Sequence, residues 1–209
     1  MTVQAASVRP MPDPLLFYVR HGETEWNREG RLQGWHDSDL TGLGRAQAEH
    51  SAEILRDLIV REGRALDDLD YVASPLGRAR ATMERIRATL GLATDRYRTD
   101  ARLAELSFGR WEGFAYPQLL ARERDVLAQR ERDRWHFTPP GGESYADLSA
   151  RLEPWNAALT RDSVVVAHGG TARALIALRG ITTPEKATAA DIEHGVVYQF
   201  TAQGMTRYA

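Results

Sequence analysis

Two apolar runs in this chain each lead directly into a histidine followed by glycine. The run from Leu15 to Val19 leads into Arg20-His21-Gly22. The run from Ser163 to Ala167 leads into His168-Gly169-Gly170. Short β-rich runs bounded by proline or glycine are typical of buried strands, and open α/β sheets bind ligands at the carboxyl ends of their strands. An always-charged arginine beside a titratable imidazole suits the handling of a phosphate ester.

The pairing of the two histidines matters more than either one alone. A lone histidine at a strand end is most often a structural residue. His21 and His168, however, occupy matching places at the ends of two predicted strands, and parallel strands would bring them to one edge. The glycine after each lets the backbone approach a ligand closely. The pattern therefore predicts a shared site.

Two further side chains fit such a site. Arg78 follows a third predicted strand, Asp70 to Ala73, and stands in the first turn of a predicted helix, where both guanidinium and helix terminus favour an anion. Read alone, it would be a solvated surface arginine. Glu105 stands among Leu103, Ala104 and Leu106, an apolar setting that favours a protonated carboxyl. Read alone, it could equally be an exposed turn residue.

The remaining pattern predicts the elements that position these residues. Apolar residues at helical spacing predict four helices: one after Thr41, one from Leu76 to Leu90 closed by Gly91, one from Tyr145 to Leu159, and one from Thr171 to about Leu178. Pro154 should kink or split the third. Two closing strands are expected at Val196 to Phe200 and near Met205 to Tyr208. The alternation predicts an α/β fold, a three-layer α/β/α sandwich with a mostly parallel central sheet.

One segment differs in kind from the rest. Tyr116 to Trp135 is dominated by Arg, Glu and Asp, so only a narrow apolar stripe could pack. We interpret residues of about 107–140 as a helical insertion that lies over the active site as a lid rather than in the core. It would either select the substrate or present a solvated face. Residues 1–14, with three prolines, are expected to form a loosely ordered leader before a single domain at 15–209.

Composition excludes several classes of function. The chain has 209 residues with 43% hydrophobic and 27% charged, typical of a globular protein. A net charge of −2 gives no field for nucleic acid or an anionic membrane. The lack of cysteine excludes disulfides, thiolate metal sites and a cysteine nucleophile. With neither a signal peptide nor a membrane-length apolar run, the cytoplasm is the expected location.

Taken together, the motifs resemble those of the histidine phosphatase superfamily, in its phosphoglycerate mutase-like branch. They follow the family's order from about Leu15 to Ala174. They are Arg20-His21-Gly22-Glu23-Thr24-Glu25-Trp26-Asn27, Leu32-Gln33-Gly34-Trp35, Leu40-Thr41-x-x-Gly44, Ser74-Pro75-Leu76-x-Arg78-Ala79, Glu105-x-x-Phe108-Gly109-x-Trp111-Glu112-Gly113, and His168-Gly169-Gly170.

The resemblance implies a role for each candidate residue. His21 would be the nucleophile and become phosphorylated, and Glu105 would protonate the leaving alcohol. Phosphoryl oxygens would be held by Arg20, Arg78 and His168, and the substrate pocket would be lined by Asn27, Gln33 and Gly169. His21 must be neutral to attack; nearby arginines lower its pKa, and a bond from its other ring nitrogen to a backbone carbonyl would set the tautomer. No metal or cofactor is expected, because the cationic residues supply the positive charge and the histidines lack metal-ligand spacing.

The resemblance leaves the phosphoryl acceptor open. Phosphoglycerate mutases carry His-Tyr-Gly and Gly-Leu-Asn-Lys after the acid, where this chain has Ser107-Phe108-Gly109 and Trp111-Glu112-Gly113. That departure favours the phosphatase branch and metal-independent hydrolysis of a small phosphorylated metabolite. Mutase activity is the alternative, and a non-catalytic binding protein on the same fold is a third. The sequence is also compatible with a homodimer.

Overall fold

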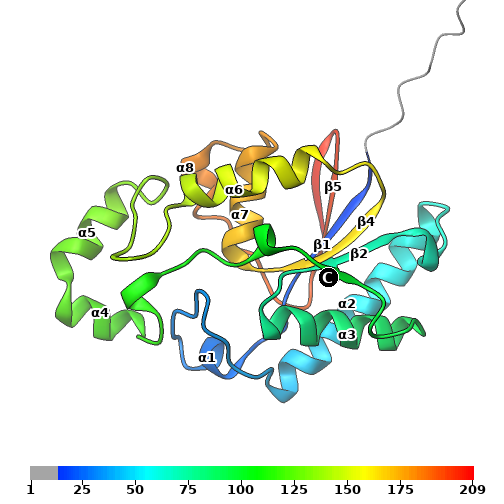
Figure 1. Ribbon diagram of the computed structural model, residues 1–209, viewed down its shortest axis with the longest axis horizontal. Helices are drawn as coiled ribbons and strands as arrows, with labels where there is room; N and C mark the ends of the chain where they lie inside the picture. Colours follow the sequence, from blue (N-terminus) through cyan, green and yellow to red (C-terminus); the bar gives the residue numbers. More distant parts are fainter. Residues whose placement is uncertain (1–13) are drawn as a thin grey trace, which may run out of the picture.

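A six-stranded sheet with helices on both faces forms the centre of the computed structural model, which describes residues 14–209 (Figure 1). The strand order is β3-β2-β4-β1-β5-β6. In chain order the strands are β1 Leu16–Arg20, β2 Asp70–Ala73, β3 Arg98–Thr99, β4 Ser163–Ala167, β5 Val197–Thr201 and β6 Gly204–Tyr208. The leader expected at 1–14 lies, except for Pro14, outside the described residues.

Strand direction places the two histidines together. β1 and β4 pair in parallel, with Arg20 opposite Ala167, so the residues that follow, His21 and His168, leave the sheet at one edge. β2 runs parallel to both β4 and β3. β5 is antiparallel to β1, and β6 is antiparallel to β5. The predicted mostly parallel sheet is confirmed.

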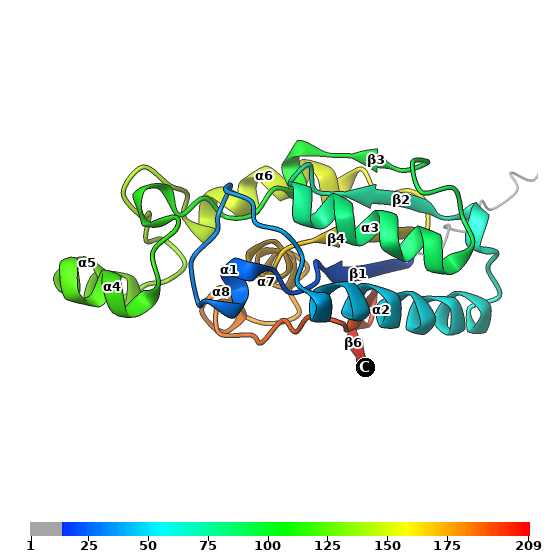
Figure 2. The same ribbon diagram turned by 90° about the horizontal axis from the view of Figure 1, so that it is seen from below.

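Alternating side chains of the strands build a core on each face of the sheet. Phe17 and Val19 of β1 face α2 (Gly42–Arg61) and α3 (Gly77–Leu90). Leu16 and Tyr18 face α6 (Tyr145–Ala157) and α7 (Gly169–Leu178) on the other side. Successive strand residues point to opposite faces, so both faces of this apolar strand are buried. The three-layer α/β/α architecture is confirmed (Figures 1 and 2).

Local signals explain most helix boundaries, with one exception. The Thr41 side chain accepts a hydrogen bond from the Gly44 N–H at 2.9 Å, and Gly91 ends α3 with a φ of 78°. The predicted split of α6 at Pro154 is wrong, because α6 continues past it to Ala157. A proline inside a helix costs about 3 kcal/mol. The buried side chains of Leu148, Leu152 and Trp155 offset that cost by packing against the sheet.

The charged insertion forms an arm, which we define as α4 (Tyr116–Arg122) and α5 (Arg124–Arg132). It extends beyond the edge where β1 ends (Figures 1 and 2). Leu119 and Leu127 are nearly fully buried with Trp111 in a separate cluster. The narrow apolar stripe expected for this segment therefore packs in a small cluster apart from the two cores of the sheet. Phe114 and Phe137, which flank the charged stretch, pack against this cluster and add to its apolar surface.

The structure contains further elements that the sequence pattern did not indicate. They include the short helices α1 (Glu25–Arg28) and α8 (Pro184–Ala187), the two-residue edge strand β3, and 3-10 helices at Leu66–Asp68, Ala101–Leu103 and Gly109–Trp111. Helix α7 begins two residues before the expected Thr171. Among the described residues, no helix combines the length and apolar character needed to cross a membrane.

Candidate active site

His21 is a buried imidazole at the first position after β1. Its backbone N–H donates to the Ala167 carbonyl at 2.9 Å, which continues the β1–β4 pairing by one residue. Its Nδ1 lies 2.8 Å from the Gly22 carbonyl oxygen. Since a carbonyl only accepts, Nδ1 carries the proton and Nε2 keeps its lone pair. The expected bond that sets the tautomer is thus present.

The surroundings of His21 keep its ring uncharged. Burial lowers the pKa of His21 well below its ordinary value of 6.5. The positive charges of Arg78 and Arg20 lower this pKa further. The predicted direction is confirmed, although burial outweighs the arginines as a cause. Nε2 is therefore available as a nucleophile at neutral pH.

Arg78 is held against His21 by acceptors from the loop after α1. Its Nε lies 3.3 Å from Nε2 of His21. Its Nη1 donates to the carbonyl oxygen of His36 and to the carboxylate of Asp37, both at 2.7 Å, and its Nη2 donates to the carbonyl oxygen of Gly34 at 2.7 Å. These contacts fix the buried guanidinium in one orientation. Since Nη2 carries two N–H groups, one is left for another acceptor.

His168 is a second buried histidine next to His21. Its ring centroid lies 5.2 Å from that of His21, and its Nε2 lies 2.7 Å from the Ser74 hydroxyl. Burial lowers the pKa of His168 well below 6.5, with further lowering from Arg78 and Arg20. The buried Tyr18 hydroxyl accepts from the His168 N–H at 2.9 Å and donates to the His168 carbonyl at 2.6 Å, which fixes the backbone there.

Two polar atoms of these site residues lack partners within residues 14–209. They are Nε of Arg20 and Nδ1 of His168, and both are buried. An unsatisfied buried polar group costs about 1–3 kcal/mol. Two such atoms close to His21 indicate a place where a polar ligand is accommodated. The Nη1 of Arg20 is already engaged, because it donates to the Ile192 carbonyl at 2.7 Å.

Glu105 occupies a polar position at the start of α7 rather than the apolar one expected. Its carboxylate accepts the backbone N–H groups of Gly170 at 3.1 Å and Thr171 at 3.2 Å, in addition to that of Leu106 at 2.9 Å. The first N–H groups of a helix have no partner within it and favour a negative charge. The expectation failed because the neighbouring apolar side chains of Leu103 and Leu106 face the core while the carboxylate does not.

Gly170 allows this close approach. A β-carbon at that position would lie 2.3 Å from Oε1 of Glu105, a distance that real atoms do not tolerate. Gly169, one residue earlier, lies beside Arg20, since a β-carbon there would be 3.6 Å from the Arg20 Nε. The glycines of His168-Gly169-Gly170 thus provide space for Arg20 and Glu105.

Asn27 and Gln33 both bind Thr24. The Asn27 Oδ1 accepts from the Thr24 N–H at 3.1 Å and from its hydroxyl at 3.0 Å, which closes the cap of α1. The Gln33 amide donates to the Thr24 hydroxyl at 2.8 Å. These bonds shape the loop that carries Gly34, His36 and Asp37 toward Arg78.

Three residues that the sequence reasoning missed lie around the same site. Asp37 binds Arg78, and Arg173 of α7 donates from Nε to the Ala190 carbonyl at 2.8 Å. His194 places its Nδ1 2.5 Å from the His21 carbonyl oxygen, with the two rings 5.4 Å apart in an edge contact. His194-Gly195 repeats the His-Gly pattern of the other two histidines just before a strand, and this signal could have identified it.

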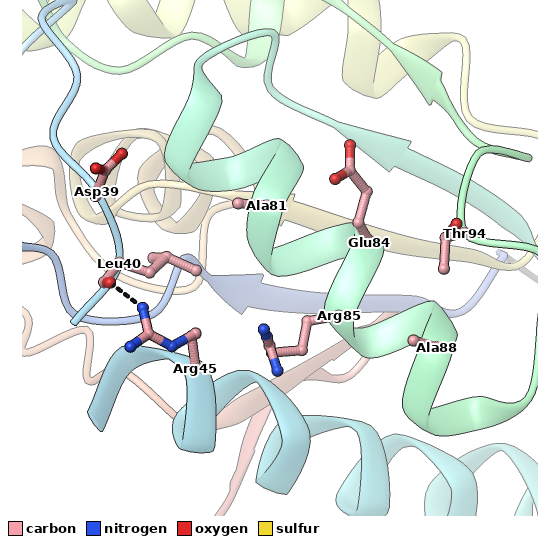
Figure 3. Close-up of a pocket in the computed structure, with 8 residues that line it drawn as sticks. All are labelled: Asp39, Leu40, Arg45, Ala81, Glu84, Arg85, Ala88 and Thr94. Atoms are coloured by element: carbon pink, nitrogen blue, oxygen red, sulfur yellow. Dashed lines mark hydrogen bonds between the residues drawn. The ribbon is translucent and has the colours of Figure 1, made fainter. Parts of the chain in front are cut away.

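A separate open groove lies between α2 and α3 (Figure 3). Asp39, Arg45, Glu84 and Arg85 are among its lining residues, and Arg45 donates to the Leu40 carbonyl at 2.7 Å. The groove has no histidine in its lining, so it offers no candidate nucleophile. The convergent buried groups around His21 are the better candidate. No cluster of three or more potential metal ligands occurs in the part of the chain that the structure describes.

Comparison with known proteins identifies the family. Residues 16–206 match the model of the histidine phosphatase superfamily (branch 1). The chain belongs to the histidine phosphatase superfamily, as the motifs predicted.

Its relatives carry two kinds of names. It is 37% identical over 176 residues to a glucosyl-3-phosphoglycerate phosphatase of Mycobacterium tuberculosis, covering 78% of this chain and 73% of the relative. It is 30% identical over 201 residues to a 2,3-bisphosphoglycerate-dependent phosphoglycerate mutase of Afipia carboxidovorans, covering 92% and 94%. Both names agree with the prediction of an enzyme that is a phosphatase or, as the alternative, a mutase.

Solved structures show the same fold. A mycobacterial glucosyl-3-phosphoglycerate phosphatase in complex with VO3 superposes with a TM-score of 0.75 at 30% identity, covering 93% of this chain and 96% of that one. An alpha-ribazole phosphatase from Shigella flexneri gives 0.76 at 25% identity, covering 93% and 95%.

Proposed function

We propose that this protein is a metal-independent phosphomonoester hydrolase that acts through a phosphohistidine at His21. The observation that carries the proposal is a buried, neutral imidazole whose Nε2 lone pair faces the fixed guanidinium of Arg78. The two unpartnered buried nitrogens on Arg20 and His168 support it, because two oxygens of a phosphoryl group would satisfy them.

In the first step, the phosphoryl oxygens bind Arg20, His168 and the remaining N–H of Arg78. Nε2 of His21 attacks phosphorus as the bond to the alcohol oxygen breaks, and Glu105 gives that oxygen its proton. Charge in the transition state spreads over the equatorial oxygens, so preorganised donors supply most of the stabilisation. The hydrogen bonds that hold Arg78 support this role, since a fixed guanidinium pays no reorganisation cost during the reaction.

In the second step, water replaces the alcohol. Glu105, now ionised, takes a proton from water while the water oxygen attacks phosphorus, and the bond to Nε2 of His21 breaks. Free enzyme and inorganic phosphate result. Glu105 accepts three backbone N–H groups and so suits this second role directly.

The substrate we propose is a small phosphorylated metabolite. The glucosyl-3-phosphoglycerate phosphatase similarity at 37% identity favours hydrolysis over transfer to a second hydroxyl. The mutase similarity extends over 92% of the chain, so mutase activity is the second candidate. We further propose that residues 107–140 act as a lid that selects the alcohol, that Asn27 and Gln33 shape the pocket through the loop they anchor, and that the enzyme works in the cytoplasm.

A phosphate-release screen tests this proposal. Sugar phosphates, phosphoglycerates and nucleotides are each incubated with wild type, with and without EDTA, alongside a mutase assay. We expect release that EDTA leaves unchanged and that His21→Ala abolishes. His50→Ala is the matched control, because His50 is exposed on α2 with its side chain 56% accessible. Release that is equal in wild type and His21→Ala, or a requirement for metal, contradicts the proposal.

A further inference from the structure

A loop at the far end of the chain is bound tightly to the candidate active site. This loop, residues 188–196, connects α8 to β5. Arg20 donates to its Ile192 carbonyl at 2.7 Å, and Arg173 donates to its Ala190 carbonyl at 2.8 Å. Hydrogen bonds from a charged donor are among the stronger ones in proteins. The loop is therefore held in a fixed place next to His21.

His194 is the residue of this loop that contacts the nucleophile. Its Nδ1 lies 2.5 Å from the carbonyl oxygen of His21, and the edge of one ring meets the face of the other at a centroid distance of 5.4 Å. A carbonyl oxygen only accepts, so Nδ1 of His194 carries the proton. His194 thus touches both the backbone and the ring of His21.

The peptide between His21 and Gly22 explains why such a contact matters. The carbonyl of this peptide belongs to His21 and lies beyond the last residue pair of β1 and β4. The N–H of the peptide belongs to Gly22, and glycine has the widest backbone freedom. The N–H of the same peptide donates to the Thr82 hydroxyl at 3.0 Å. His194 and Thr82 therefore hold the two ends of one peptide plane.

The orientation of that plane sets the direction of the His21 ring. Gly22 is the next residue after this peptide bond, and its carbonyl oxygen accepts a hydrogen bond from Nδ1 of His21 at 2.8 Å. Rotation of the plane would move this acceptor and, with it, the opposite ring nitrogen, Nε2. Arg78 approaches Nε2 with only a long contact of 3.3 Å and cannot fix the ring alone.

We propose that His194 is a positioning residue that holds the His21–Gly22 peptide and so aims Nε2 of His21 at the phosphorus atom. The inference rests on the proposed function, in which His21 is the nucleophile. Burial and the charge of Arg20 lower the pKa of His194 to about 4, so at neutral pH it acts as an uncharged donor. Its contribution is geometric and comes from one hydrogen bond.

Two variants separate the donor from the ring. His194→Phe keeps an aromatic edge against His21 and removes the donor. His194→Asn loses the ring and keeps an N–H near the position of Nδ1. His50→Phe on the exposed side of α2 is the control for a histidine-to-phenylalanine change. Each variant is assayed with p-nitrophenyl phosphate for kcat, KM and the rapid-quench rate of His21 phosphorylation, and its Tm is measured.

We expect His194→Phe to lower both kcat and the phosphorylation rate about tenfold, the scale of one lost hydrogen bond, with KM changed less than about twofold. His194→Asn should retain the wild-type phosphorylation rate within about threefold. A misfolded protein would lose substrate binding as well, so the split between kcat and KM separates positioning from stability.

The outcomes that overturn the inference are distinct from failure of the proposed function. Wild-type phosphorylation in His194→Phe, or equal losses in His194→Phe and His194→Asn, overturns the positioning role while His21→Ala stays inactive. Activity that persists in His21→Ala refutes the nucleophile and the positioning role together. A measurement on wild type covers the case in which His194→Phe does not fold. Its ¹H–¹⁵N spectrum should show a protected Nδ1–H of His194 that disappears in His194→Asn, and lack of such a proton also overturns the inference.

Discussion

Tyr18→Phe isolates the bonds that hold the backbone of His168. The Tyr18 hydroxyl accepts from the His168 N–H at 2.9 Å and donates to the His168 carbonyl at 2.6 Å, and the side chain is fully buried. The carbonyl keeps a second bond from the Ala172 N–H at 3.0 Å, so only the His168 N–H loses its partner. Phenylalanine keeps the ring and its edge contact with Phe200, in which the ring centroids are 6.2 Å apart, and it leaves no large cavity.

The expected loss is therefore that of one orphaned buried N–H, about 2 kcal/mol within the usual range of about 1–3 kcal/mol. At about 2–4 °C per kcal/mol for a chain of this size, the Tm should fall by about 4–8 °C. Urea unfolding followed by circular dichroism measures the free energy of unfolding. The matched control is Tyr208→Phe. It removes a hydroxyl that accepts from the exposed Arg61 at 2.8 Å, and the free energy of unfolding should change by less than about 0.5 kcal/mol. A loss for Tyr18→Phe as small as that of the control would refute the reasoning.

Three further predictions follow from the site. In the folded protein the pKa values of His21, His168 and His194 lie below 6.5, so near that pH the unfolded chain binds more protons than the folded chain. The free energy of unfolding should therefore fall as the pH drops below about 6.5. A urea midpoint that stays constant from pH 7.5 to 5.5 would contradict this. For the same reason the activity should persist down to about pH 6, whereas a loss centred at pH 6.5 would show that His21 titrates normally. Gly170→Ala should lower kcat more than about tenfold, because an alanine β-carbon there would lie 2.3 Å from Oε1 of Glu105 and would push the carboxylate away. Gly42→Ala, whose β-carbon would lie 3.9 Å from the end of Arg45, should leave kcat unchanged, and equal kcat values for the two variants would contradict the role of Glu105.

The central strands could be predicted because a short run of apolar residues indicates a buried strand without any long-range information. Leu16 to Val19 of β1 and Val164 to Ala167 of β4 are buried, largely apolar runs, as strands covered on both faces require, and a glycine-containing motif follows each run. Their shared edge predicted which two histidines meet. By contrast, β3 has two exposed residues and exists only through its pairing with β2, so no local pattern marks it.

Long-range contacts explain what the sequence did not reveal about the site. Asp37 becomes a partner of Arg78 only because the loop after α1 folds back onto the start of α3. His194 reaches His21 because β5 lies next to β1 in the sheet. Glu105 has apolar neighbours in sequence but polar partners in space, since the N-terminus of α7 approaches from another part of the chain. The local sequence therefore marked Glu105 as a candidate site residue but did not predict the polar partners of its carboxylate.

The most direct test of the account is chemical identification of the protein-bound phosphoryl group. Wild type is mixed with p-nitrophenyl phosphate, quenched in base within milliseconds, and examined by mass spectrometry and ³¹P NMR. We predict one acid-labile phosphoryl group per chain, on Nε2 of His21, that forms before phosphate is released and does not form in His21→Ala. Phosphate release without any phosphorylated histidine, or a phosphoryl group on another residue, would contradict His21 as the nucleophile.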